Sequence, residues 1–157
     1  MSDELTHLDA RGRARMVDVG AKPPLRRRAV AEGHLQAKPE TLDRLFTGDT
    51  PKGDAMAVAR IAGIAAAKRT DELIPLCHGL PLDMVAVDFE RTGPGTVSIR
   101  AEAATVARTG VEMEALTAVA VAGLTLWDML KAVDPALELG GIVLREKTRE
   151  PLAAPEA

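Results

Sequence analysis

A long stretch near the end of the chain, residues 111–133, constrains the fold more than any other segment. It reads VEMEALTAVAVAGLTLWDMLKAV, with no charged residue from Ala115 to Trp127. The pattern predicts a helix that is apolar around its whole circumference, and such a helix is buried on both sides. In a two-layer fold the outer side of a helix faces water, so we expect a neighbouring subunit to cover it. A hydrophobic helix of a monomer is the alternative.

Polar residues gather at the two ends of this predicted helix. Glu112 and Glu114 lie in the first turn, where carboxylates suit the positive end of the helix dipole. Asp128 and Lys131 share a face in the last turns, where a surface ion pair is the simpler explanation. The step from Glu114 to Asp128 is about 21 Å along a helix axis. If both ends are functional, a small substrate would need ends from two copies of the chain.

The rest of the chain alternates between strand and helix patterns. Alternating apolar residues in 82–90 and 96–107, joined by the turn RTGPG, predict an antiparallel hairpin. The expected elements are strand 28–37, helices 38–48 and 54–69, strands 82–90 and 96–107, helix 111–133 and strand 136–147. This order predicts an α+β, ferredoxin-like split βαβ fold, in which an antiparallel sheet carries helices on one face.

The length of 157 residues fits one domain, which we place at 1–147. Residues 1–27 lack periodicity and include AKPPLRRR, so they are expected to form an extended N-terminal arm. The proline- and alanine-rich tail, 148–157, is expected to be flexible. The chain has no tyrosine and few other aromatic residues, so its core must consist of smaller aliphatic side chains.

Composition and charge narrow the classes of function. The net charge of −3 gives no general attraction to nucleic acid, and the predicted strands lack the exposed aromatics of a common RNA-binding sheet. No apolar run is long enough to predict a membrane span, and the charged start lacks the apolar segment of a secretory signal. A single cysteine excludes an internal disulfide, which agrees with a cytoplasmic location.

Basic residues cluster at places where they could meet an anion. Three arginines at 26–28 precede the predicted first strand, and Lys52 lies in the loop TPKGD. Lys131 and Lys147 close later elements. These side chains could hold phosphates, or they could simply be solvated on arms and helix ends. The chain has neither GxxxxGK[ST] nor a strand-linked GxGxxG, so a bound phosphate would not be held as in P-loop or Rossmann proteins.

The only cysteine, Cys77, is followed by His78 in the segment LIPLCHGLPL. A structural zinc site needs four ligands, and one cysteine with three scattered histidines makes such a site a poor explanation. Adjacent side chains of an extended segment point to opposite faces, so we expect no nucleophile–base pair but one residue toward the core and one toward a cavity. A free cysteine is usually buried, so His78 is the better candidate for a polar contact.

Several segments closely resemble one known family. AAAKRTDELIPLCHGLPL, TGVEMEALTAVAVAGLTLWDMLKAVD, THLDARGRARMVDV and KGDAMAVARIAGI are similar to the molybdenum-cofactor biosynthesis accessory protein C family, the cyclic pyranopterin monophosphate synthases. The resemblance runs from Leu5 to Lys147, nearly the whole chain. It implies a ferredoxin-like α+β subunit assembled as a homo-hexamer, a trimer of dimers, with the pocket at a subunit interface.

The resemblance also implies a reaction. The family converts 3′,8-cyclo-7,8-dihydroguanosine 5′-triphosphate into cyclic pyranopterin monophosphate and diphosphate, so we expect a lyase of molybdenum cofactor (molybdopterin) biosynthesis. A radical SAM enzyme would supply the substrate. No resident cofactor or metal is expected, although Mg²⁺ could accompany the triphosphate. Opening a purine ring and rebuilding it as a pterin needs repeated proton transfers, which a carboxylate with neighbouring amines can provide.

The functional residues of the family can be assigned by motif. In WDMLKAV, Asp128 resembles the catalytic aspartate and Lys131 its lysine partner, and Lys52 in KGD resembles a loop lysine. Substrate-binding roles are implied for the LCH segment, for the VEME segment and for two basic residues, namely Leu76, Cys77, His78, Glu112, Met113, Glu114, Arg27 and Lys147. Asp18 is a weaker candidate for the same pocket.

Two segments depart from the family pattern. Members usually read LCHPL where this chain has Gly79, and they commonly end with a Gly-Gly-Lys-Ser-Gly run where it has KTREPLAAPEA. Two other functions remain open. A non-catalytic, ferredoxin-like nucleotide-binding module that regulates a partner would bind the substrate without turnover. A metal-binding redox protein would contain stoichiometric zinc.

Overall fold

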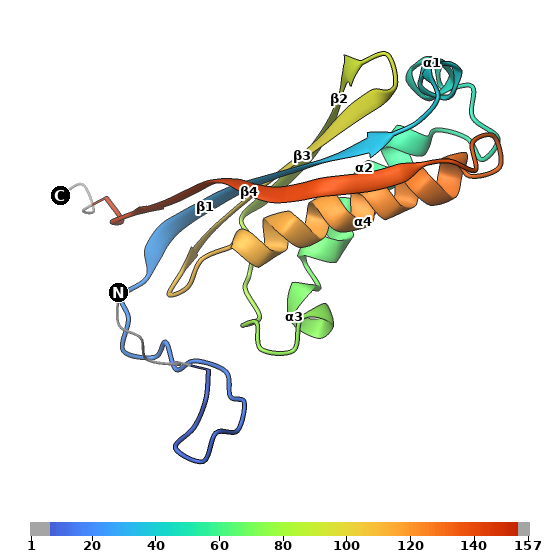
Figure 1. Ribbon diagram of the computed structural model, residues 1–157. Coiled ribbons are helices and arrows are strands. Elements are labelled where there is room, and N and C mark those ends of the chain that lie inside the picture. Colours follow the sequence, from blue (N-terminus) through green and yellow to red (C-terminus); the bar gives the residue numbers. More distant parts are fainter. Residues whose placement is uncertain (1–6, 154–157) are drawn as a thin grey trace.

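A four-stranded antiparallel sheet with two long helices on one face forms the body of the protein in the computed structural model, which describes residues 7–153 (Figure 1). The strand order is β2-β3-β1-β4. In chain order the elements are β1 (Leu25–Gln36), α1 (Pro39–Thr47), α2 (Ala55–Ala67), α3 (Thr70–Leu73), β2 (Met84–Gly93), β3 (Thr96–Ala107), α4 (Glu112–Leu130) and β4 (Glu138–Glu150). The α+β class and the antiparallel sheet are confirmed, and the topology is consistent with a ferredoxin-like fold.

The predicted order of the long elements is confirmed, but two boundaries move. β1 begins at Leu25, three residues before the predicted start, so Arg26 and Arg27 also lie within the strand. β4 continues to Glu150, which pairs with Arg26 on β1. Residues 148–150, which the sequence assigned to a flexible tail, are therefore part of the sheet. The boundary moved because the partner strand also extends beyond the predicted limit, and only pairing reveals this.

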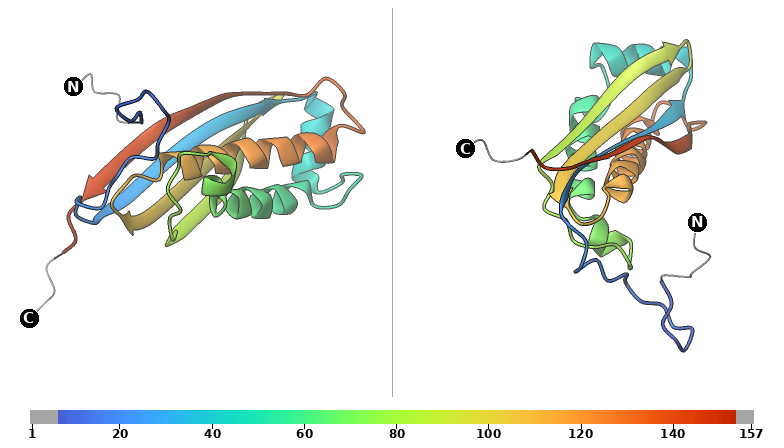
Figure 2. Two further views of the ribbon diagram at one scale, coloured as in Figure 1. Left: turned by 90° about the horizontal axis from the view of Figure 1, so that it is seen from below. Right: turned by 90° about the vertical axis from the view of Figure 1, so that its left-hand side faces the viewer.

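The core lies between the sheet and α4, with α2 packed beside α4 (Figure 2). Ala115, Ala118 and Ala122 are completely buried along α4. At Gly63 on α2, an added Cβ would lie 2.9 Å from the carbonyl oxygen of Ala118. The helices therefore approach more closely than any larger residue at Gly63 would permit, which fits a core of small side chains.

The outer side of the two long helices is apolar and exposed in the single chain. Ile61 on α2 keeps 68% of its surface exposed, and Leu124 on α4 keeps 60%. A shallow hollow between the same helices is lined by Ala62, Leu73 and Val121, among others. The expected burial of α4 on both sides is thus only half realised within one chain. Large exposed apolar side chains of this kind are typical of surfaces that contact another protein, a ligand or a membrane.

α4 is long and apolar enough to cross a membrane if length and composition are the only criteria. Half of its apolar window is buried inside the protein, however, and the helix contacts α2 and three of the four strands most extensively. The central helix of a folded core passes the same test, and the packing explains the apolar composition of the buried side of α4.

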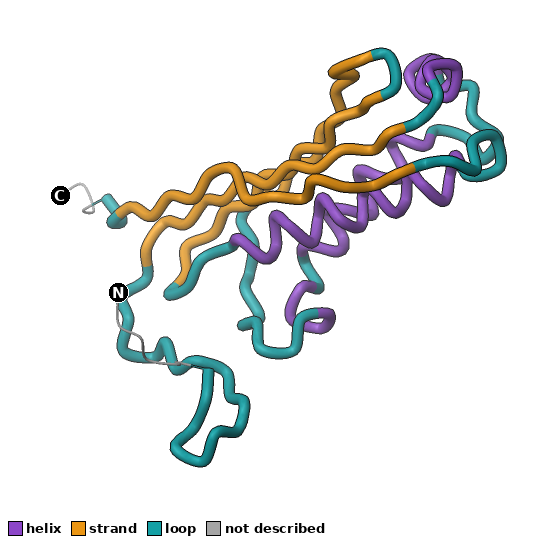
Figure 3. The backbone as a smooth tube through the Cα atoms, viewed as in Figure 1, coloured by secondary structure: helices purple, strands orange, loops and turns teal. Residues whose placement is uncertain are grey.

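The N-terminal arm leaves the body of the protein as loop and turns (Figure 3). Its described part, residues 7–24, contains a small turn closed by hydrogen bonds between Asp9 and Arg13 and no helix or long strand. The predicted extended character of the arm agrees with this course. Residues 1–6 of the arm and 154–157 of the tail lie outside the described residues.

A buried aspartate fixes the end of α4 relative to the rest of the fold. Asp134 is fully buried, and it accepts hydrogen bonds from the backbone N–H of Lys38 and the hydroxyl of Thr41. Both donors lie at the start of α1, where Lys38 provides no side-chain cap, so Asp134 ties this helix start to the residues that follow α4. The connection holds the region after Asp128 in place.

Candidate active site

Two lysines converge on Asp128 at the C-terminal end of α4. One carboxylate oxygen lies 2.8 Å from Lys52 Nζ, and the other lies 2.6 Å from Lys131 Nζ. Lys52 also donates to the main-chain oxygen of Asp128 at 3.1 Å. The three residues predicted to be catalytic therefore meet within one chain, and we call them the lysine–aspartate cluster.

Local structure explains how the loop lysine reaches the helix. Lys52 lies between α1 and α2, and the next residue, Gly53, has a φ of 92°, which favours glycine. The hydroxyl of Thr50 donates to the main-chain oxygen of Gly53 across the turn. Asp54 then caps α2 by accepting from the N–H of Ala57 at 3.0 Å. The turn and the cap hold Lys52 over the end of α4.

The two ammonium groups set the charge state of the cluster. Hydrogen bonds from Lys131, and then from Lys52, lower the pKa of Asp128 to about 2. The carboxylate is 54% exposed, so a substrate can reach it from solvent. With such a pKa, Asp128 is a weak base while both lysines hold it. A substrate that drew one ammonium toward its phosphates would raise the basicity of Asp128 and make proton transfer possible.

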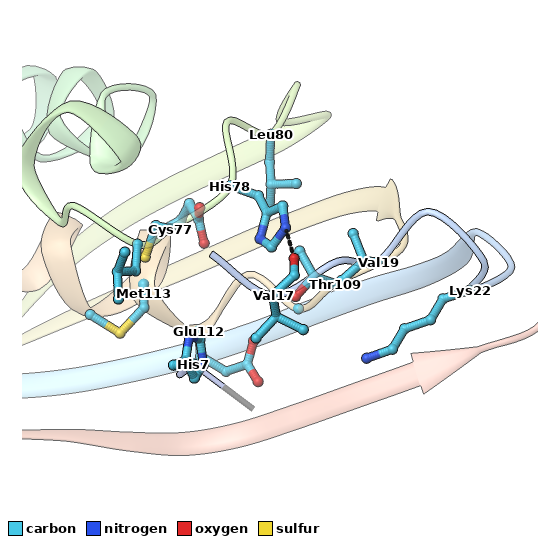
Figure 4. Close-up of a pocket in the computed structure, with 13 residues that line it drawn as sticks. His7, Val17, Val19, Lys22, Cys77, His78, Leu80, Thr109, Glu112 and Met113 are labelled. Carbon is cyan, nitrogen blue, oxygen red and sulfur yellow. Dashed lines mark hydrogen bonds between the residues drawn. The ribbon is translucent and has the colours of Figure 1, made fainter. Parts of the chain in front are cut away.

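A cavity of about 460 Å³ lies at the opposite end of α4 (Figure 4). It has the size of a small-molecule site. Three segments form its walls, namely the loop after α3, the start of α4 and the N-terminal arm. Six predicted substrate-binding residues line it together: Leu76, Cys77, His78, Glu112, Met113 and Glu114. The LCH and VEME segments thus line one cavity, and their role in substrate binding stays a prediction.

His78 connects the cavity to the N-terminal arm. Its Nε2 lies 2.8 Å from the carbonyl oxygen of Val17, and because a carbonyl only accepts, this nitrogen donates (Figure 4). The arm brings His7, Val17 and Lys22 to the cavity, and sequence reasoning did not select any of them. Asp18, the weaker candidate, accepts from the N–H of Gly20 in a turn and does not line the cavity.

Cys77 and His78 both line the cavity, contrary to the expectation that one of them would face the core. The chain turns at Pro75 and Leu76, where the N–H of Cys77 donates to the carbonyl oxygen of Ile74, and it continues as irregular loop rather than as a strand. The two-face rule for extended strands therefore does not apply. Burial raises the pKa of the Cys77 thiol, and the carboxylates of Glu114 and Asp71 raise it further. His78 binds Val17 rather than Cys77. Cys77 is therefore a neutral thiol, and His78 is not placed to act as its base.

Glu114 is an unusual carboxyl group in the wall of the cavity. Only 4% of the residue is exposed, and burial raises its pKa to about 7. The charges of Glu112 and Asp71 act in the same direction, while a backbone hydrogen bond opposes them. Near neutral pH the group exists partly as the acid, so it can donate a hydrogen bond or a proton as well as accept one.

A second, basic cavity of about 360 Å³ adjoins the first and shares Lys22, Thr109, Gly110 and Glu112 with it. The two predicted basic residues lie here. Lys147 forms an ion pair with Glu112, and Arg27 donates to the carbonyl oxygens of Ala107 and Arg108 at 3.4 Å each. A binding site that joins both cavities would have an acidic, partly apolar region next to a strongly basic one.

The structure does not bring all predicted site residues together in one chain. The lysine–aspartate cluster lies at the end of α4, and the cavities lie at its start, about 21 Å away along the helix axis. Within residues 7–153, no three histidine, cysteine, aspartate or glutamate side chains gather as metal ligands would.

The fold and these two regions define a small α+β protein with a cavity of small-molecule size, an adjoining basic cavity and a lysine–aspartate cluster. Comparison with known proteins identifies the family: residues 16–149 match the MoaC family model, and the chain belongs to the MoaC family. A cyclic pyranopterin monophosphate synthase of Roseiflexus sp. (strain RS-1) is 60% identical over 149 residues, which cover 94% of each chain. The synthase of Thermomicrobium roseum is 60% identical over 92% of this chain and 87% of its own. Cyclic pyranopterin monophosphate synthase 1 of Mycobacterium tuberculosis is 59% identical over 92% of this chain and 85% of its own.

Proposed function

We propose that this protein is a lyase of molybdenum cofactor biosynthesis that converts 3′,8-cyclo-7,8-dihydroguanosine 5′-triphosphate into cyclic pyranopterin monophosphate and diphosphate. Family membership and relatives named as cyclic pyranopterin monophosphate synthases support the reaction. One structural observation carries the proposal for this chain. Lys52 and Lys131 both contact the carboxylate of Asp128, so the three residues proposed to be catalytic lie together.

The chemistry requires groups that move protons and groups that stabilise phosphate charge. A cyclic phosphate forms when a hydroxyl oxygen of the substrate bonds to the α-phosphorus and the bond to the leaving diphosphate breaks. Asp128 is suited to accept protons once a lysine has moved away from it, and Lys131 is suited to donate them. Lys52 and Lys131 would also stabilise negative charge that develops on the phosphates.

The start of α4 is suited to the guanine-derived part of the substrate. That part presents N–H donors, and carboxyl groups such as those of Glu112 and Glu114 can accept hydrogen bonds from them. Glu114 in its neutral form can also donate to a ring oxygen or nitrogen. His78 and the main chain of Leu76 and Cys77 would form the neighbouring wall. No resident cofactor is needed for these roles, and Mg²⁺ would enter only with the triphosphate.

The proposed active unit contains more than one chain. We place the start of α4 from one subunit beside the lysine–aspartate cluster of another, within a homo-hexamer built as a trimer of dimers. Two observations support this arrangement: the axial separation within α4 and the exposed apolar surface around Ile61 and Leu124. Other proposed features are a cytoplasmic location and a supply of substrate by a radical SAM enzyme. The proposal includes no role for nucleic acid or membranes.

Turnover of the cyclised nucleotide by the wild type and by Asp128→Asn tests the function directly. The variant keeps the size of the side chain and removes its charge, so turnover should fall about 10³-fold. Since Asp128 is 54% exposed, the thermal midpoint should change little. Binding of the substrate without turnover by the wild type would instead support the regulatory nucleotide-binding module.

A further inference from the structure

The basic cavity beside the start of α4 carries more positive charge than its surroundings balance. Its described lining contains five cationic side chains, those of Lys22, Arg27, Arg108, Lys147 and Arg149. Glu112 is the single carboxylate among the described lining residues, so four positive charges remain. Neither Arg108 nor Arg149 is among the site residues predicted from the sequence.

Strand pairing brings two of these arginines directly opposite each other. Arg149 on β4 is the register partner of Arg27 on β1, and Lys147 is the partner of Ala29. Side chains two residues apart on a strand share a face, so Lys147 and Arg149 point to the same side of the sheet. Directly opposed residues of an antiparallel pair have Cβ atoms roughly 5 Å apart, and like charges in such pairs destabilise the sheet.

The other face of the same strands shows how this chain balances its arginines elsewhere. There Arg28 is 2.6 Å from Glu102 and 2.6 Å from Glu146, and Arg145 is 2.8 Å from Glu32. On the cavity face, neither Arg27 nor Arg149 has a carboxylate partner among the described residues. Carboxylates thus neutralise Arg28 and Arg145 on the face away from the cavity. Arg27 and Arg149 on the cavity face lack such partners among the described residues and could bind an added anion.

The charge and position of the cavity fit a polyphosphate. A triphosphate carries about four negative charges at neutral pH, which matches the excess of positive charge. Arginines bind phosphate oxygens through two parallel N–H groups. The basic cavity also shares Lys22, Thr109, Gly110 and Glu112 with the larger one. A ligand could therefore place its ring system in the larger cavity and its phosphates between β1 and β4.

We infer that Arg149, which the continuation of β4 places opposite Arg27, is a substrate-binding residue that holds the outer phosphates of the triphosphate together with Arg108. This inference rests on the proposed function, because it assigns the phosphate chain of that substrate to one end of the site. It also gives the last residues of β4, 148–150, a role in ligand binding in addition to their pairing with β1.

Binding of inorganic tripolyphosphate to the full chain tests the inference without a need for turnover. Isothermal titration calorimetry should show about tenfold weaker binding for Arg149→Ala and a smaller loss for Arg149→Lys, which keeps the charge but not the fork. Arg145→Ala is the matched control, since Arg145 lies on the same strand and is paired to Glu32 on the other face. Equal affinities for Arg149→Ala and Arg145→Ala would overturn the inference.

Thermal unfolding without ligand separates binding from a structural role. Removal of Arg149 relieves its repulsion with Arg27, so Arg149→Ala should melt at the same or a slightly higher temperature than the wild type. Arg149→Glu should raise the melting temperature further, since it creates an opposite-charge pair, while it abolishes tripolyphosphate binding. A lower melting temperature for Arg149→Ala with unchanged tripolyphosphate affinity would show a purely structural residue and overturn the inference.

The same variants distinguish this inference from the proposed function. If the wild type binds tripolyphosphate through Arg149 but does not turn over the cyclised nucleotide, the phosphate site stands and the function fails. If the wild type turns over the nucleotide and Arg149→Ala keeps both its KM and its tripolyphosphate affinity, the function stands and the phosphate site fails.

Discussion

The two ends of α4 carry carboxyl groups of opposite character. Asp128 at the C-terminal end is half-exposed between two lysines, and its pKa is lowered to about 2. Glu114 at the N-terminal end is buried beside other carboxylates, and its pKa is raised to about 7. One helix therefore presents a permanently ionised group at one end and a group that can be neutral at the other.

The difference shows that environment, rather than residue type, assigns the chemical role of each end. Opposite charges nearby stabilise a carboxylate, whereas burial and like charges stabilise the acid. The ionised end is suited to a cycle of proton transfer controlled by lysines. The partly neutral end is suited to recognition of a ring with both donors and acceptors. A site that combines both ends would hold an acid and a base whose pKa values differ widely, as multistep proton transfer requires.

Removal of the lysines should affect the C-terminal end most. Lys131→Ala should raise the pKa of Asp128 more than Lys52→Ala does, because the hydrogen bond from Lys131 is the larger cause of the low value. Turnover should fall about 10²-fold in each variant. NMR titration of the Asp128 carboxyl carbon, together with turnover assays, measures both effects. An unchanged pKa of Asp128 in both variants would refute the proposed control by the lysines.

The raised pKa of Glu114 predicts that the free energy of unfolding depends on pH. Glu114 has a pKa near 4.5 in the unfolded chain and about 7 in the folded protein, so the folded state holds this proton more tightly. Its contribution to the free energy of unfolding is present below about pH 4.5 and is lost as the pH rises through 7. Glu114→Gln should remove this loss, which is on the order of 3 kcal/mol for the cited difference in pKa.

Denaturant titrations between pH 4.5 and 8 would measure that effect. Glu72→Gln is the matched control for the loss of one negative charge, because Glu72 is a surface residue whose side chain is 58% exposed. A pH dependence that is equal in Glu114→Gln and in the wild type would show that Glu114 does not titrate as proposed.

The smallest effect is expected at Cys77. Its thiol is kept protonated by burial and nearby carboxylates, and His78 donates to Val17 instead of contacting it. Cys77→Ser should therefore change turnover by about threefold or less. A loss of several orders of magnitude would indicate a covalent role for the thiol and would make the buried end catalytic in its own right.

The sequence predicted the elements well because their periodicities are local. The strict alternation of β2 and β3 and the uncharged middle of α4 are visible without any partner. The lysine–aspartate cluster was predicted from the resemblance of KGD and WDMLKAV to family motifs. Spacing alone suggested only the i,i+3 pair of Asp128 and Lys131, since Lys52 comes from a distant loop.

Features that depend on distant pairing could not be predicted. The opposition of Arg27 and Arg149 follows from the register of β1 with β4, which is set by contacts over more than a hundred residues. The contact of His78 with Val17 depends on where the arm lies. Cys77 was assigned a face by a rule for extended strands, and its loop does not follow that rule.

The central claim is that the two ends of α4 from different subunits form one active site, and mixing of inactive subunits tests it most directly. Asp128→Asn disables one end, and a His78→Ala/Lys147→Ala double variant disables the other. Each variant alone should lack turnover. Co-refolded equal mixtures should recover about a quarter of the wild-type activity, because random assembly leaves that share of shared sites intact. If the mixtures recover no activity beyond the sum of the separate variants, each site lies within a single chain and the claim is wrong.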